Sequence, residues 1–156
     1  IEITEDDVRQ IQEIQFAYQM LAARNALREA DHLQMAEEIE KFIEEYRRSD
    51  NVVESCRCIQ GILAVFYRNS NNRALISKVT SMTGLDEILH ELFIIPREKG
   101  GSGGQYHSGI IYFEQIHAAV LERDFGKICD SLEQHQLWSR AYILKNLETV
   151  QKRNRA

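Results

Sequence analysis

The scarcity of helix-breaking residues limits what this chain can fold into more than any other feature of its sequence. Only one of the 156 residues is proline, and five of the eight glycines lie within a single segment, residues 96–109. Proline removes a hydrogen bond from a helix interior, and glycine costs about 1 kcal/mol there relative to alanine. The stretches on both sides of this segment are therefore free to form long helices.

Apolar side chains recur in these stretches at the spacing of amphipathic helices, and no stretch shows the sustained alternation of a strand. Helices are expected after the caps Thr4 and Asp31, after Ser49 and Asp50, over about 74–95 with Gly84 inside, and over about 108–123 and 125–152. Because each has one apolar side, several helices must share one interior. The sequence predicts an all-α antiparallel bundle of about six to seven helices, in a single domain over residues 1–156.

The first and last of these helices have long apolar stripes, which indicate the faces that point into the bundle. On the first helix the expected inward side chains are Val8, Ile11, Ile14, Tyr18, Leu21 and Ala22. On the last helix they are Ile128, Leu132, His135, Trp138, Ala141, Ile143, Leu144 and Leu147.

The glycine-rich segment, PREKGGSGGQYHSG, does not fit a phosphate-binding loop. No Lys-Ser or Lys-Thr follows its glycines, and no strand is expected before it. We expect residues 100–104 to belong to a flexible connection between helices, either native or introduced as a replacement.

Composition excludes several other classes of protein. The net charge of −5 argues against binding of nucleic acid by this chain itself, because phosphate binding needs a basic face. Cys56, Cys58 and Cys129 contain no C-x-x-C pair and are expected to be free thiols in a reducing cytoplasm. No signal peptide or membrane-spanning run is present, and the opening Ile1 favours a piece of a longer protein.

Four stretches are similar to one known family in their order and spacing. They are VRQIQEIQFAYQMLAARNAL at residues 8–27, EYRRSDNVVES at 45–55, SNNRAL at 70–75, and IHAAVLERDFGKICDSLEQH at 116–135. Together they resemble the FCD effector-binding domain of GntR-family transcription regulators. The resemblance covers nearly the whole chain and implies a cytoplasmic, homodimeric domain that senses a small-molecule effector. It also implies that DNA is bound only through an N-terminal winged helix-turn-helix, which this chain does not contain.

The resemblance further implies where a metal would lie. Many FCD domains hold a divalent ion with an Asp and a His four residues apart on one helix and with two later histidines. The corresponding positions here are Ile59, Leu63, Phe113 and His135, and three of these have no lone pair to offer. We therefore expect that the metal site is lost and that no cofactor is bound. A register shifted by one turn would instead use His117 with His135.

The effector site implied by the resemblance is also more apolar than usual. The arginine that the family places on its first helix falls near Ile11, with Arg9 and Arg24 as the nearest alternatives. One hypothesis is a pocket for an apolar or weakly acidic effector, with polar contacts from His117, His135 and Arg57 and apolar contacts from Phe113, Ile59 and Leu63. The other is that side chains fill this space and effector binding is lost.

No residue lies in a diagnostic catalytic setting such as G-x-S-x-G, so we expect no enzymatic activity. The sequence favours a regulatory domain that senses an effector and dimerises. Two alternatives remain open: a helical dimerisation module without a small ligand, and a metal-dependent carboxylate sensor.

Overall fold

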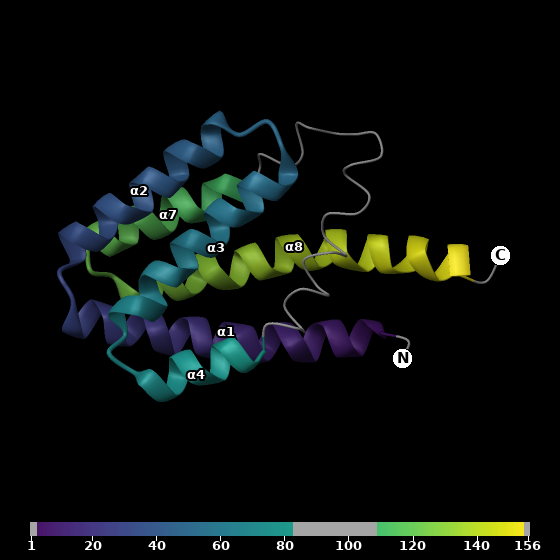
Figure 1. Cartoon of the computed structure of the whole chain (residues 1–156), viewed down its shortest axis with the longest axis horizontal. Helices are drawn as coiled ribbons and strands as arrows, with labels where there is room; N and C mark the ends of the chain where they lie inside the picture. Colours follow the sequence, from purple (N-terminus) through teal and green to yellow (C-terminus); the bar gives the residue numbers. More distant parts are fainter. Residues whose placement is uncertain (1–2, 83–108, 155–156) are drawn as a thin grey trace.

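The computed structural model describes residues 3–82 and 109–154, which are helical with short connections (Figure 1). The described helices are α1 (Glu5–Glu29), α2 (His32–Arg48), α3 (Val52–Asn69), α4 (Arg73–Ser81), α7 (Ile110–Leu121) and α8 (Phe125–Asn154). These residues contain no strand. The predicted all-α bundle is therefore confirmed for residues 3–82 and 109–154.

Five of the described helices form a closed ring around one interior. α1 packs against α3 and α8, α2 packs against α3 and α7, and α7 packs against α8. α4 contacts α1 and α3 at the edge of this ring. α1 and α8 run antiparallel and side by side, and both extend past the other helices toward the end where the two chain termini lie (Figure 1).

Side-chain caps fix where the helices begin. Thr4 forms a capping box with Asp7, and Asp31 accepts hydrogen bonds from the first N–H groups of α2, as predicted. α3 begins slightly later than expected, because the capping side chain is Asn51. Asp124 accepts a hydrogen bond from the backbone N–H of Lys127 at 3.0 Å, at the junction between α7 and α8.

The prediction of one helix over about 74–95 is wrong at its C-terminal end. α4 ends at Ser81, and Met82 has already left helical geometry with a ψ of 0°. Gly84 follows closely, and glycine is a poor helix former, so termination here has a local cause. The rest of that predicted helix and the glycine-rich residues 100–104 lie outside the described residues.

Buried apolar side chains form two separate groups. The main core takes residues from all six described helices, and its bulkiest fully buried members include Phe66, Phe113, Ile62 and Ile116. The second core lies toward the chain termini and consists of Val8, Cys56, Ile143 and Leu147. α1, α3 and α8 supply both groups.

Two further sequence predictions can be compared with the described residues. All three cysteines are free, with Cys56 and Cys58 buried, and desolvation raises the pKa of Cys58 and Cys129. Among the described helices, none is both long enough and apolar enough to cross a membrane.

Candidate functional site

A layer of buried polar side chains separates the two apolar cores. We define this polar layer as Gln12 of α1 and Gln136, Ser139 and Arg140 of α8. The first three are only 2%, 8% and 9% exposed, and Arg140 is half-buried. Along α8 the layer lies between Leu132 of the main core and Ile143 of the second core.

Hydrogen bonds across the polar layer connect the first and last helices. Gln12 Nε2 donates to Ser139 Oγ at 3.3 Å, and Arg140 Nε donates to Gln12 Oε1 at 2.6 Å. Ser139 Oγ in turn donates to the backbone carbonyl of Gln136 at 3.0 Å. Both ends of the Gln12 amide are thus satisfied, and its contacts hold α1 and α8 in register.

Gln136 differs from its neighbours in the polar layer. Its Nε2 atom is buried and has no hydrogen-bond partner among residues 3–82 and 109–154. A buried donor without an acceptor costs about 1–3 kcal/mol, so native structures rarely retain one without a reason. Gln136 lies one turn from the Gln12 contact, on the side toward the main core.

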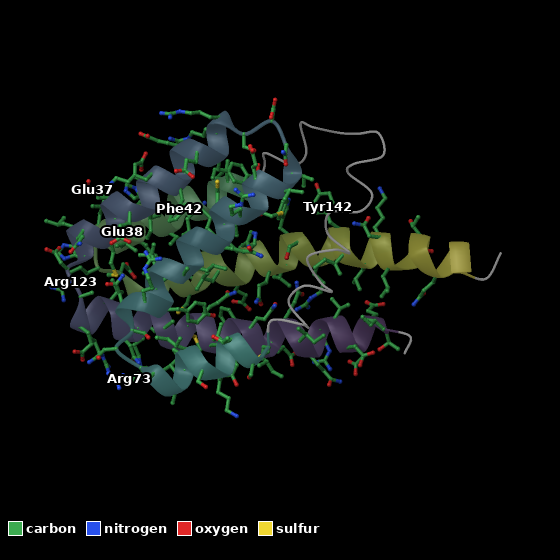
Figure 2. All side chains as sticks on the ribbon, viewed as in Figure 1. Glu37, Glu38, Phe42, Arg73, Arg123 and Tyr142 are labelled. Carbon is green, nitrogen blue, oxygen red and sulfur yellow. The ribbon has the colours of Figure 1, made fainter. Side chains whose placement is uncertain are left out.

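Aromatic residues of α7 and α8 surround His135. Its ring centroid lies 4.6 Å from that of Phe113, 5.8 Å from that of Trp138 and 6.1 Å from that of Tyr112. Trp138 also contacts Tyr142, at 5.0 Å between ring centroids, and Tyr142 extends from α8 on the side away from α1 (Figure 2). The His135 side chain keeps a partly exposed surface, but burial among these rings lowers its pKa to about 4. The imidazole is therefore neutral at pH 7.

Close packing of Trp138 requires a glycine at the start of α7. A Cβ atom added to Gly109 would lie 2.6 Å from the Cη2 atom of Trp138, which real Cβ atoms do not tolerate. The indole ring therefore rests directly on the Gly109 backbone, and this contact helps to fix the ring beside His135.

The six residues expected to line an effector site do not all lie together. Phe113 and His135 are in contact, and Ile59 and Leu63 of α3 pack, half-buried, against the main core that contains Phe113. His117 lies between α7 and α2, where its Nε2 atom is 3.3 Å from Glu40 Oε2.

Arg57 lies at a third location. It is exposed and lines a surface groove between α2 and α3 together with Glu45, Arg48, Ser49, Glu54 and Cys58. The structure thus separates Arg57 and His117 from the pair of rings at Phe113 and His135.

The polar layer is absent from the features that the sequence predicts. Apolar spacing predicts Ile11 and Ile14 as inward side chains of α1, but Ile11 is only half-buried, Ile14 is 47% exposed, and Gln12 is buried. A usable signal existed, because Gln12 lies four residues after Val8 and Gln136 lies four residues after Leu132. This spacing places each amide on the face of a buried apolar residue.

Within residues 3–82 and 109–154, no three His, Cys, Asp or Glu side chains gather closely enough to hold a metal ion. The expected loss of the family's metal site stays a prediction.

No family model, no curated protein and no solved structure matches the chain. The chemistry of the interior must therefore be read from its own residues. It offers amide, hydroxyl and guanidinium groups from α1 and α8 beside aromatic and aliphatic surfaces from α3, α7 and α8. Such a combination suits non-covalent binding of a small molecule.

Proposed function

We propose that this chain is the effector-sensing and dimerisation domain of a bacterial, cytoplasmic transcription regulator of the GntR type. It binds a small metabolite inside the bundle, and DNA is bound by a separate N-terminal segment. The proposal combines the resemblance of residues 8–27, 45–55, 70–75 and 116–135 to FCD domains with the geometry of the interior.

One observation carries the proposal. The resemblance assigns Phe113 and His135 to a single site, and their rings are in contact at 4.6 Å although they come from two different helices. Amphipathic periodicity requires only that both residues face inward, and it does not require this contact. The pairing therefore supports the choice of these positions as part of an effector site.

The ring of helices suggests how binding of an effector in the interior would alter the dimer. α1 contributes Gln12 to the polar layer and also packs against α4. We place the dimer face on these two helices, which are in contact and carry the exposed side chains Ile14 and Ile76, 47% and 40% exposed. A ligand that binds more tightly to one arrangement of α1 shifts the dimer toward that arrangement.

Ligand binding is tested by thermal shift against a metabolite panel, because a ligand that binds only the folded state raises Tm. We expect at least one compound to raise the Tm of the wild type. His135→Asn should weaken the affinity for that compound at least about tenfold and so reduce the Tm shift. His117→Asn is the matched control, since His117 lies against Glu40 and should retain the shift. Equal effects of the two variants would remove His135 from the site.

Dimerisation is tested by light scattering of the purified chain. Ile14→Glu and Ile76→Glu should each give monomers, while Leu137→Glu, at a side chain of α8 that is 54% exposed, should leave the dimer intact.

A dimer without any stabilising ligand would favour the simple dimerisation module. Stoichiometric metal in elemental analysis would favour the metal-dependent sensor. A basic winged-helix segment encoded upstream of Ile1 would support the regulator, and an unrelated domain there would contradict it.

A further inference from the structure

The surface groove between the end of α2 and the start of α3 is lined by charges of both signs. We propose that this groove binds a small zwitterion, a molecule with one carboxylate and one ammonium group such as a free amino acid. The groove is separate from the interior site of the proposed function, and either site can fail without the other.

The shape of the groove follows from the antiparallel hairpin that α2 and α3 form (Figure 1). The ring of Phe42 rests against Gly61, so these two residues lie at the same level of the two helices. Glu45 and Cys58 lie three residues from that contact, toward the connecting turn. There the groove has a volume of about 300 Å³ and is floored by the buried side chains of Ser49 and Cys58. This volume is at the lower end of the range for small-molecule sites, about 300–1,000 Å³, and suits a small ligand.

Each of the two helices places a glutamate and then an arginine on the groove. α2 supplies Glu45 and Arg48, and α3 supplies Glu54 and Arg57. Because the two helices run antiparallel, the order of the charges is reversed across the groove. Glu45 of α2 therefore lies at about the level of Arg57 of α3, and Arg48 at about the level of Glu54.

These facing charges do not neutralise one another. Within the described part of the chain, none of Glu45, Glu54 and Arg57 forms an ion pair, and Arg48 reaches only a glutamate one turn earlier on α2, at 3.6 Å. All three unpaired groups nevertheless lie near the floor of the groove. Desolvation is the main cause that raises the pKa of Cys58, and smaller effects come from the charges of Glu45, Arg57 and Glu54. Opposite charges thus converge on the groove and leave a space between them.

The balance of these charges selects the class of ligand. The four charged side chains sum to zero, so a simple anion would meet two carboxylates and a simple cation would meet two guanidinium groups. A zwitterion places its carboxylate beside an arginine and its ammonium group beside a glutamate, and it avoids both repulsions. Each contact is made at the surface and contributes little alone, so both are needed for binding.

The experiment compares zwitterions with molecules of the same chain length that carry a single charge. Glycine, β-alanine and γ-aminobutyrate are titrated into the wild-type chain by calorimetry at low ionic strength, where surface charges are least screened. The anionic probes are acetate, propionate and butyrate, and the cationic probes are methylamine, ethylamine and propylamine. We expect at least one zwitterion to bind at least about ten times more tightly than its two singly charged counterparts.

Variants of the groove locate that binding. Arg57→Gln and Glu45→Gln should each weaken the affinity for the zwitterion at least about tenfold, because each removes one of the two ion pairs. Arg24→Gln, at an exposed arginine of α1 that does not line the groove, is the matched control and should keep the wild-type affinity. All three side chains are exposed, so each variant should unfold within about 2 °C of the wild-type Tm.

Direct pairing of Glu45 with Arg57 in solution is the competing explanation of the facing charges. It predicts that either single variant lowers the Tm of the free protein and that the double variant lowers it no further. That result would overturn the proposal, because the groove would then be closed by its own side chains.

The remaining contrary results are equally clear. If no zwitterion binds, or if the singly charged probes bind equally well, the ligand class is wrong. If binding survives Arg57→Gln and Glu45→Gln but is lost in His135→Asn, the zwitterion occupies the interior, which overturns the groove site and leaves the proposed sensing function standing.

Discussion

The two apolar cores of this bundle differ in how completely helices enclose them. The main core receives side chains from all six described helices and contains twelve or more residues that are nearly inaccessible, such as Ile62 and Phe113. The second core has four buried members, Val8, Cys56, Ile143 and Leu147, drawn from three helices. Between the cores, α1 and α8 are joined by amide and hydroxyl groups.

This difference predicts that the main core is more rigid than the second core. The main core receives side chains from all six described helices, so removal of a side chain there leaves a cavity that the surrounding helices cannot easily fill. The second core is bounded by fewer of the described helices and adjoins the polar layer. We therefore expect the main core to set the global stability and the boundary between the cores, where Phe113 contacts His135, to respond to a ligand.

The comparison is tested most strongly by the same substitution in each core. Ile62→Ala should lower the free energy of unfolding by about 4 kcal/mol, and Ile143→Ala by about 2 kcal/mol, because the thinner second core can relax around the lost side chain. The two side chains are 0% and 4% exposed, so burial alone does not predict this difference. Urea denaturation gives both values, and equal costs would show that the two cores are equally rigid.

The pH dependence of stability tests the boundary between the cores, where His135 lies. Its pKa of about 4 in the folded chain is below the value near 6.5 of an unfolded histidine, so the unfolded state binds more protons between these values. The free energy of unfolding should therefore fall as the pH is lowered from about 6.5 to about 4, by at most about 3 kcal/mol, since the ring is partly exposed.

Urea denaturation at several pH values measures this loss. His135→Phe should flatten the curve in that window, because phenylalanine binds no proton. An unchanged slope in His135→Phe would show that the imidazole is not desolvated by its aromatic neighbours.

The smallest expected change in stability comes from substitution of two glycines with different surroundings. An added Cβ at Gly61 of α3 would lie 2.4 Å from Phe42 Cε1, whereas at Gly126 of α8 the nearest atom is Asp124 Oδ1 at 3.4 Å. Gly61→Ala should cost about 1–2 kcal/mol through displacement of the Phe42 ring, even after the gain in helix propensity. Gly126→Ala should be neutral or stabilise by up to about 1 kcal/mol. Thermal unfolding distinguishes the two, and a stabilised Gly61→Ala would show that Phe42 moves freely.

The sequence predicted those features that depend on local chemistry. Thr4 and Asp31 cap the starts of α1 and α2 because short polar side chains satisfy the first free N–H groups of a helix. The all-α class followed from periodicity and from the lack of helix breakers in the long stretches.

The features that sequence did not predict depend on contacts between helices. Only a small rotation of α1 decides whether Ile11 or Gln12 points inward. The partners of Gln12 that fix this rotation, Ser139 and Arg140, lie far along the chain. Likewise Glu40, on the charged side of α2, meets His117 only because α2 packs against α7.

The closed ring also has a consequence for how the chain acquires its structure. Of the described helices α1 is synthesised before the others, yet one of its two main neighbours in the ring is α8, which follows all of them in the sequence. Until α8 is made, Gln12 of α1 lacks its partners Ser139 and Arg140, and the ring remains open. Closure of so long a loop is slow compared with local helix formation, so nascent chains that stall before α8 should depend on chaperones.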